Sequence, residues 1–449
     1  MNHHRSLRVG AALRAFLGTA LLTLLLGAAL GAETFPADRF DGFDPQLTEL
    51  ITVLLRENSQ LQSAQASWQS AVTRTDQVKP LPDPMLTYRY FVSRPETRVG
   101  PQAQGVQLKQ AIPWSGKRGQ AAQRSEHLAS GVAWEVQQLE RSLVARLKRS
   151  YFNAAYLQEA LTVNAEEAAL LQRFERIALT RYSTGHGDQQ SVIKVQTEIS
   201  RLVDQRHSLT LQLQSAERRI AELIGRPSAW LELRPISLHL LELDLDPQSL
   251  ESDSVRDHPG VRAAAKRIEA DNAWLRQRNL GSRPDFSFGL SYIDVRKRED
   301  DAGMLFPPDG NGRDIWAVSV GLSLPIHGGK IRAGKAEAQS SLLASQRALQ
   351  TTRDHLRSEV QQALLRLESI EERARLYEEV IVPQAGESLA SAEAAYTTDR
   401  RDFLDLLDAQ RVLFQVRLTS HRLLADYWNA LADLEWGLGR SFPGEGSAR

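Results

Sequence analysis

The chain has 449 residues, and its 55 Lys and Arg balance 55 Asp and Glu, so the formal net charge is zero. This balance argues against a protein that binds nucleic acid through bulk charge, and no nucleic-acid partner is predicted. The sequence contains no Cys, which excludes thiol catalysis, Cys-based zinc sites and disulfides.

Residues 1–32 have the pattern of a secretory signal peptide. Basic residues precede an apolar run from Ala15 to Leu30, and small residues follow it. We expect cleavage near Gly31 or Ala32; an uncleaved membrane anchor is the alternative. No later stretch holds about 18 consecutive apolar residues, the length that a spanning helix needs. The mature chain is therefore expected to be soluble in the periplasm or inserted in a membrane through β-strands.

The remaining sequence contains an internal duplication. The offset between matching residues is 202 at the first matching pair below and 214 at the last, and one local insertion accounts for the change. A period of this length predicts two copies of one structural unit rather than a solenoid. The matches, in chain order, are Pro82-Asp83 with Pro284-Asp285, Gly116-Lys117 with Gly329-Lys330, Tyr182 with Tyr396, and Gly225-Arg226 with Gly439-Arg440.

The duplication divides the mature sequence into two units. We expect a first repeat at 33–226, a linker at 227–250, a second repeat at 251–440 and a C-terminal tail at 441–449. Each repeat is predicted to contain a helix, a β-hairpin and a long helical hairpin, in that order.

Long helices are expected to take up most of each repeat. The first helix is predicted from about Asp44 to Val78, and its counterpart from about Ser254 to Leu280. The Pro-free part from Ser115 to Arg181 is long enough for a rod of about 100 Å. The two helical hairpins are expected to turn at tips near 182–187 and 396–400.

The two β-hairpins, at about 85–112 and 285–325, alternate between apolar and polar or small residues. Phe286, Phe288 and Leu290 share one face of their strand. Each run is roughly nine residues, close to the length of a membrane-spanning strand. A small soluble sheet with one buried face is the alternative. Four strands do not close a membrane barrel, because such barrels begin at about eight strands and an open edge in lipid is costly. If these strands lie in a membrane, they would therefore have to form a barrel together with strands of other chains.

Several strings make the chain resemble the TolC-type outer-membrane efflux proteins. They are the duplicated plan, Pro82–Met85 before the first strand, Ile112–Arg118 after the second strand and Leu324–Lys330 after the fourth. The string Thr97–Gln102 is similar to sequences of the family branch that is linked to heavy-metal cation efflux.

The resemblance implies a fold class of mixed α with membrane β. Two repeats of long helix, β-hairpin and long helix would place four strands per chain in a shared 12-stranded barrel of a homotrimer. A periplasmic α-helical barrel would continue from it. The implied partners are a periplasmic adaptor (membrane fusion) protein, an inner-membrane efflux pump and outer-membrane lipid.

The tips of the helical hairpins carry a motif that the family uses to meet the adaptor. Tyr182 and Gly185 match its Tyr/Phe-x-x-Gly turn in the first repeat. In the second repeat Tyr396 matches, but Asp399 stands where Gly is usual; Asp tolerates the left-handed conformation better than most residues. Without the resemblance, both turns are plain helix–turn–helix connectors.

Asp405 and Asp408 form an acidic pair just after the second tip. Their i, i+3 spacing places them on one face of a helix. From the residues alone, a solvated face near a helix start is the alternative. In the family these positions form aspartate rings that constrict the periplasmic entrance, so the resemblance implies a gate. The first repeat has Ser191 and Lys194 at the equivalent positions, so the gate would come from the second repeat alone.

The sequence thus predicts a passive exit duct of a tripartite efflux system, with heavy-metal cations as the expected substrate. The alternatives are a drug or protein export channel of the same family and a soluble periplasmic coiled-coil adaptor or scaffold. No catalytic motif is present, so the chain is not expected to be an enzyme, and no cofactor or metal site is predicted.

Overall fold

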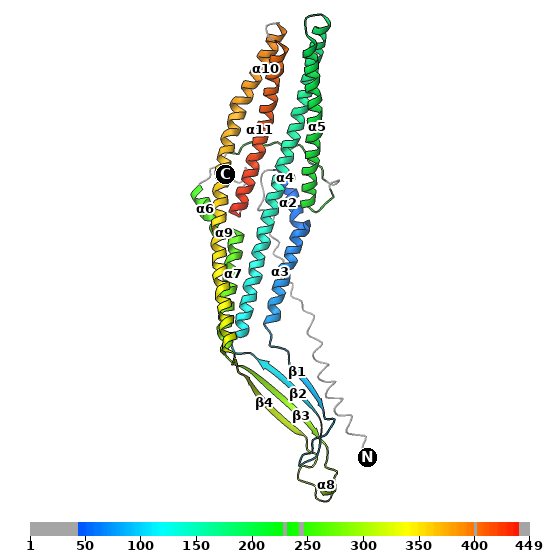
Figure 1. Cartoon of the computed structure of the whole chain (residues 1–449), viewed down its shortest axis with the longest axis vertical. Helices are drawn as coiled ribbons and strands as arrows, with labels where there is room; N and C mark the ends of the chain where they lie inside the picture. Colours follow the sequence, from blue (N-terminus) through cyan, green and yellow to red (C-terminus); the bar gives the residue numbers. More distant parts are fainter. Residues whose placement is uncertain (1–43, 228–230, 242–246, 399–401, 440–449) are drawn as a thin grey trace. The chain divides into compact units, whose positions relative to one another are not determined.

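The computed structural model describes residues 44–227, 231–241, 247–398 and 402–439, which belong to one compact unit (Figure 1). The predicted signal peptide, the tail at 441–449 and Asp399 lie outside these residues. None of the helices within the described ranges is long and apolar enough to cross a membrane.

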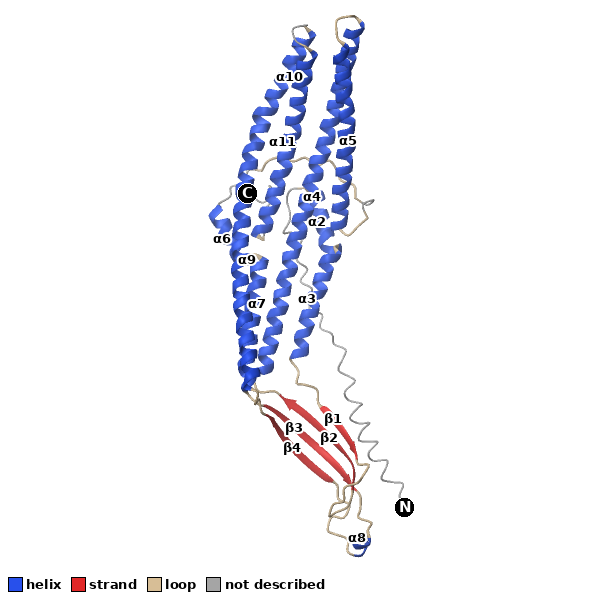
Figure 2. Ribbon diagram, viewed as in Figure 1, coloured by secondary structure: helices blue, strands red, loops and turns tan. Residues whose placement is uncertain are grey.

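Helices account for most of the described chain (Figure 2). In the first repeat they are α2 (Pro45–Glu57), α3 (Ser59–Val78), α4 (Lys117–Ser183) and α5 (Gln189–Leu223). In the second repeat they are α6 (Pro247–Asp257), α7 (Pro259–Asn279), α8 (Asp301–Leu305), α9 (Gly328–Leu376), α10 (Val382–Thr397) and α11 (Phe403–Leu438). A 3₁₀ turn (Leu280–Ser282) follows α7, and a π-helical turn (Tyr377–Ile381) joins α9 to α10. Helix α6 begins inside the expected linker at 227–250.

The first helix of each repeat is divided in two. The predictions of single helices over Asp44–Val78 and Ser254–Leu280 were therefore wrong. At the first break Asn58 leaves the helical conformation, and its side-chain oxygen accepts a hydrogen bond from the N–H of Leu61 at 2.9 Å. This is the geometry of an N-cap, which starts α3 anew. At the second break Pro259 has no N–H to continue the helix and takes the first position of α7.

The end of another helix of the same repeat packs against each break. Gly225 follows α5 with φ +70°, and a Cβ there would lie 2.8 Å from the carbonyl oxygen of Glu57. Gly439 follows α11 with φ +66°, and a Cβ there would lie 2.9 Å from Cδ of Pro259. A left-handed backbone and a close approach thus both require glycine at these duplicated positions.

The four strands form one antiparallel sheet in the order β1 (Met85–Tyr90), β2 (Gln102–Ile112), β3 (Asp285–Val295) and β4 (Ile315–Ser323). The central pair, β2 with β3, joins the two repeats. The register brings Leu86, Leu108, Leu290 and Val318 side by side across all four strands. The alternation predicted for each strand therefore becomes one continuous apolar face.

That apolar face is uncovered in the single chain. Leu86 is 69% exposed, Trp316 67% and Val318 79%. The outer edges of β1 and β4 also lack a strand partner among the described residues. An exposed apolar face with two open edges is suited to an apolar phase and to strands of further chains. The alternative of a soluble sheet with one buried face does not fit these exposures.

The helical part is organised around α4, which packs along α3, α5, α7 and α11 (Figure 1). Midway along it, Phe152 lies 5.2 Å from the ring of Trp428, and Tyr151 and Tyr427 are fully buried beside them. The indole N–H of Trp428 donates to the carbonyl oxygen of His239 at 3.0 Å. The irregular segment 231–241 is thereby held against the helices, and the helical part extends beyond the sheet to the two tips.

Candidate functional site at the helical tips

The two helical hairpins, α4 with α5 and α10 with α11, pack together near their tips. One apolar cluster joins them, and Phe174, Val195, Leu406 and Leu407 are among its buried members. Sequence periodicity shows that each helix has an apolar side, but the pairing of the hairpins depends on their contact in three dimensions. The cluster sets the positions of the predicted gate and tip residues.

Ion pairs also join the two hairpins. Arg411 on α11 pairs with Glu198 on α5, and Arg417 on α11 pairs with Glu166 on α4 at 2.7 Å. Burial would raise the pKa of Glu198, but the hydrogen bonds and charges of Arg411 and Arg201 together hold it below its usual value. The carboxylate is 12% exposed, so it depends on these partners. The pairing of Glu198 with Arg411 was not predicted from the sequence.

Asp405 and Asp408 lie in the first turns of α11. Both side chains are exposed, while Phe403, Leu406 and Leu407 between and beside them are buried in the tip cluster. The helix thus presents its acidic pair on the side opposite the apolar cluster. The structure brings the two carboxylates to one exposed face, as the i, i+3 spacing requires.

The first tip is open to solvent. Tyr182 is 48% exposed, and Gly185 has φ +77° with no atom near the place of a Cβ. The N–H of Gly185 donates to the carbonyl oxygen of Tyr182 at 3.1 Å and closes the turn. Asp188 then accepts a hydrogen bond from the N–H of Ser191 at 2.6 Å and starts α5.

At the second tip, the tyrosine of the motif is buried. Tyr396 is 6% exposed and lies 5.5 Å from the ring of Phe403. The guanidinium carbon of Arg181 lies 4.3 Å from the Tyr396 ring, and its Nη2 donates to the Tyr396 carbonyl oxygen at 2.9 Å. Arg181 was not identified from the sequence as a residue of the tips. A signal was available, because the two repeats differ at this position and the second repeat has Ala395 there. Asp399 lies outside the described residues.

A polar groove lies between the two tips. Arg181, His186, Asp188, Tyr396 and Asp402 contribute to its lining. Within the described residues, no three His, Asp or Glu side chains converge to hold a metal ion. The chemistry available at the tips is therefore that of exposed charges and a groove rather than of a closed coordination site.

The chain is similar to known efflux proteins of the outer membrane. Residues 252–440 match the family model of the outer membrane efflux protein. The cobalt-zinc-cadmium resistance protein CzcC of Cupriavidus metallidurans is 23% identical over 403 residues, which cover 88% of this chain and 90% of that protein. These matches identify the chain as an outer membrane efflux protein.

Solved structures of outer-membrane channels share the fold of this efflux protein. CusC has a TM-score of 0.75 at 18% identity, over 92% of this chain and 96% of its own. The outer-membrane channel OprN has a TM-score of 0.76 at 18% identity, over 91% and 94% of the two chains. The predicted fold class, with long helices and a β-domain of four strands per chain, is confirmed.

These similarities also indicate the class of function and the location. The efflux protein is an exit channel in the outer membrane, with its helical part in the periplasm, and not an enzyme. Members of the family are trimeric channels that work with periplasmic adaptors and inner-membrane pumps. The soluble periplasmic scaffold, the alternative that the sequence left open, is therefore not what this chain is.

Proposed function

We propose that the efflux protein forms a homotrimer that conducts heavy-metal cations out of the cell. Three copies of the four-stranded sheet would supply the missing strand partners of β1 and β4 and form one barrel of about twelve strands. The name of CzcC, resistance to cobalt, zinc and cadmium, supports metal cations as the cargo.

The observation that carries the proposal is the exposed acidic pair on α11. In a trimer, Asp405 and Asp408 of three chains would place about six carboxylates around the periplasmic entrance. Rings of carboxylates favour cations in channels, and carboxylate oxygens bind divalent cations directly. Since the aspartates lie on the side of α11 away from the apolar cluster, their replacement leaves the packing of the tips in place.

Removing the two charges is expected to reduce the preference for cations. In a planar bilayer, the Asp405→Asn/Asp408→Asn variant should lose cation selectivity, and divalent cations should block it about tenfold less well, because the local negative potential is lost. Single-channel conductance with Zn²⁺ titration measures both quantities.

The matched control is Asp204→Asn/Glu222→Gln, which removes two exposed carboxylates from α5. It should behave like the wild type. Equal selectivity in the double aspartate variant and the wild type would remove the gate from the proposal. A wild-type channel without any cation preference would favour drug or protein export instead.

We further propose that the first tip is the surface that meets a periplasmic adaptor. The exposure of Tyr182 and the open turn at Gly185 support this proposal. The ring of Tyr396, in contrast, is buried and packs inside the second tip. Asp399 remains part of the proposed second contact. A photo-crosslinking amino acid placed at Tyr182 in cells should therefore form a crosslink to a periplasmic adaptor.

Mass spectrometry of the crosslinked band identifies the partner. The same amino acid at Leu211, which is 67% exposed on α5 and far along the helix from the tip, is the control and should not give this product. Equal yields at both positions, or an absence of product at Tyr182, would contradict an adaptor contact at the first tip.

A further inference from the structure

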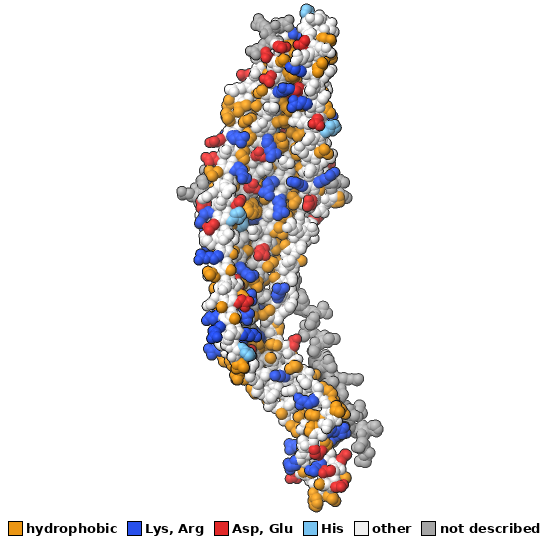
Figure 3. All heavy atoms as spheres, in the orientation of Figure 1, with side chains coloured by type: hydrophobic (Ala, Val, Ile, Leu, Met, Phe, Trp, Pro, Cys, Tyr) orange, Lys and Arg blue, Asp and Glu red, His pale blue; other side chains and the backbone are white. Residues whose placement is uncertain are grey.

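Basic residues gather where the helices meet the sheet. The chain segments at this junction, 76–84, 112–121, 274–286 and 324–337, hold nine Lys and Arg against four Asp and Glu, a net charge of +5 in a chain whose total is zero. Lys and Arg side chains are visible at this end of the helical part in Figure 3, next to the apolar side chains of the sheet. The excess is therefore local.

Some of these cations are neutralised within the chain. Lys117 pairs with Asp285 at 2.8 Å, which ties the start of α4 to the start of β3. Lys79 lies 3.4 Å from Glu126, and Arg278 lies 3.7 Å from Glu337. These pairs connect elements of the fold. The other cations of the junction form no ion pair with a carboxylate among the described residues.

We give the name basic collar to five of the other cations: Arg118, Arg283, Lys330, Arg332 and Lys335. Among the residues that the structure describes, none forms an ion pair with any of them. Arg118 donates to the carbonyl oxygen of Lys79 at 3.0 Å, and Arg283 lies 5.8 Å from the Trp114 ring. Neither α4 nor α9 has an acidic residue in its first turn. The collar thus presents positive charge that the chain does not compensate.

The collar directly borders the apolar face of the sheet. Leu322 is 52% exposed, Leu324 66% and Ile326 77%, and Lys330 follows them in the chain. Along the chain, an exposed apolar surface is followed by exposed cations. In a lipid leaflet, hydrocarbon is likewise followed by phosphate, so the two surfaces are complementary. The same order holds at the start of α4, where Arg118 follows the end of β2.

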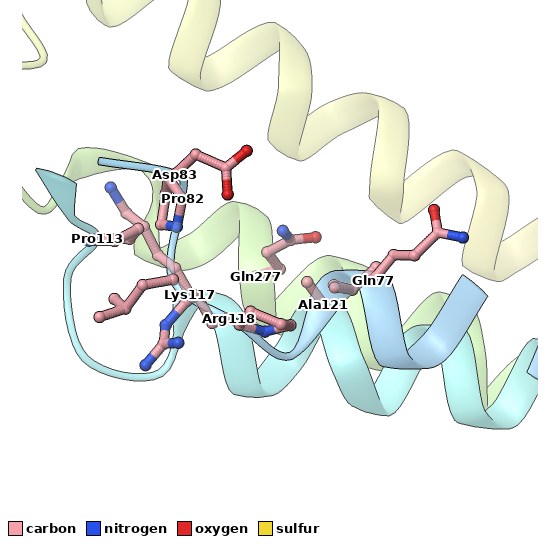
Figure 4. A pocket seen from close by; sticks show the side chains of 11 residues that line it. Gln77, Pro82, Asp83, Pro113, Lys117, Arg118, Ala121 and Gln277 are labelled. Atoms are coloured by element: carbon pink, nitrogen blue, oxygen red, sulfur yellow. The ribbon is translucent and has the colours of Figure 1, made fainter. Parts of the chain in front are cut away.

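A groove at this junction combines both properties (Figure 4). Pro82 and Pro113 contribute apolar walls, and Arg118 and the paired Lys117 line it from α4. Asp83 also lines the groove. Among the described lining residues, the groove thus sets apolar walls beside one cation without an ion pair, Arg118, an arrangement suited to the glycerol phosphate part of a phospholipid.

The opposite end of the sheet lacks this charge. The two loops there, 91–101 and 296–314, hold six Lys and Arg against six Asp and Glu. Of the two ends of the sheet, only the end next to the periplasmic helices carries the basic excess, so the excess lies toward the periplasmic side of the outer membrane.

We propose that the basic collar binds the anionic headgroups of phospholipids in the periplasmic leaflet of the outer membrane and sets the depth of the sheet in the bilayer. This inference rests on the location in the outer membrane and not on the cargo, so it stands or falls separately from the metal proposal.

Native mass spectrometry of the detergent-purified protein, titrated with phosphatidylglycerol or with zwitterionic phosphatidylcholine, tests the collar. Wild type should bind phosphatidylglycerol more tightly. The Lys330→Gln/Arg332→Gln/Lys335→Gln variant should bind it roughly 100-fold more weakly, at about fivefold per charge, with no change for phosphatidylcholine. Millimolar inorganic phosphate should not displace the lipid, because a lipid headgroup and not free phosphate is the ligand.

The control variant, Arg206→Gln/Arg218→Gln/Arg219→Gln, removes three exposed cations from α5 and should keep wild-type affinity. If the triple collar variant does not assemble, Lys335→Gln alone should show the fivefold loss, and Lys335→Arg should restore binding. Equal affinity of wild type for the two lipids, displacement by phosphate, or unchanged binding in the collar variants would each overturn the proposal.

Discussion

Phe174→Ala is expected to weaken the packing of the paired tips by about 3–5 kcal/mol. Phe174 is 2% exposed in the apolar cluster that joins the two helical hairpins. Truncation removes its buried contacts and leaves a cavity that the long, stiff helices cannot easily fill. Hydrogen exchange of peptides from the tips of α5 and α11 should accelerate by roughly two to four orders of magnitude, while the centre of α4 keeps its protection.

Phe174→Leu is the matched control for this variant. It keeps most of the apolar volume, so its cost should stay below about 1.5 kcal/mol. The alanine variant should also leak more current, because the hairpins carry the proposed gate. If exchange at the tips is the same in the alanine variant and the wild type, the cluster does not hold the hairpins together.

Glu167→Gln is expected to remove a pH-dependent loss of stability. Glu167 on α4 is 9% exposed, and its Oε1 has no hydrogen-bond partner within the described structure. The pKa of this carboxyl is raised from 4.5 to about 8, chiefly by burial; the charge of Arg417 lowers it and that of Glu198 raises it. Between these values the folded chain keeps a proton that the unfolded chain has lost.

The stabilising contribution of this proton is complete below pH 4.5 and is lost as the pH rises to about 8. The neutral amide of Glu167→Gln avoids that loss, so at pH 9 the variant should be more stable than wild type by roughly 2–4 kcal/mol. At pH 4 the two should nearly coincide. The midpoint of thermal unfolding, followed by circular dichroism across this pH range, measures the difference.

An exposed carboxyl provides the comparison. Glu222→Gln on α5 should show the wild-type pH profile. Parallel profiles for Glu167→Gln and the wild type would mean that the carboxyl is already ionised in the folded chain and that the pocket around it admits water.

Local chemistry explains why much of the architecture is predictable. Strand alternation depends only on the two-residue period of an extended chain, so Phe286, Phe288 and Leu290 had to share a face. The i, i+3 spacing of Asp405 and Asp408 likewise determines their common side of α11. The duplicated glycines at 225 and 439 mark equivalent helix ends, because a left-handed residue after a helix is most often glycine.

At Asn58 and Pro259, apolar periodicity predicts helices that are too long. Capping by the Asn58 side chain and the missing N–H of Pro259 are local signals, and they outweigh the periodicity that continues across them. The docking of Gly225 and Gly439 against these breaks, in contrast, depends on contacts between residues far apart in the chain.

The sequence by itself determined the duplicated plan, the strand faces and the positions of the charged pairs along each helix, because these follow from chain geometry over a few residues. The tertiary structure alone decided that Tyr396 is buried under Arg181 while Tyr182 is exposed, and that Glu198 meets Arg411. Equivalent residues in a repeat share a local conformation. Their burial and their partners depend on the packing of different helices around them, which no local pattern encodes.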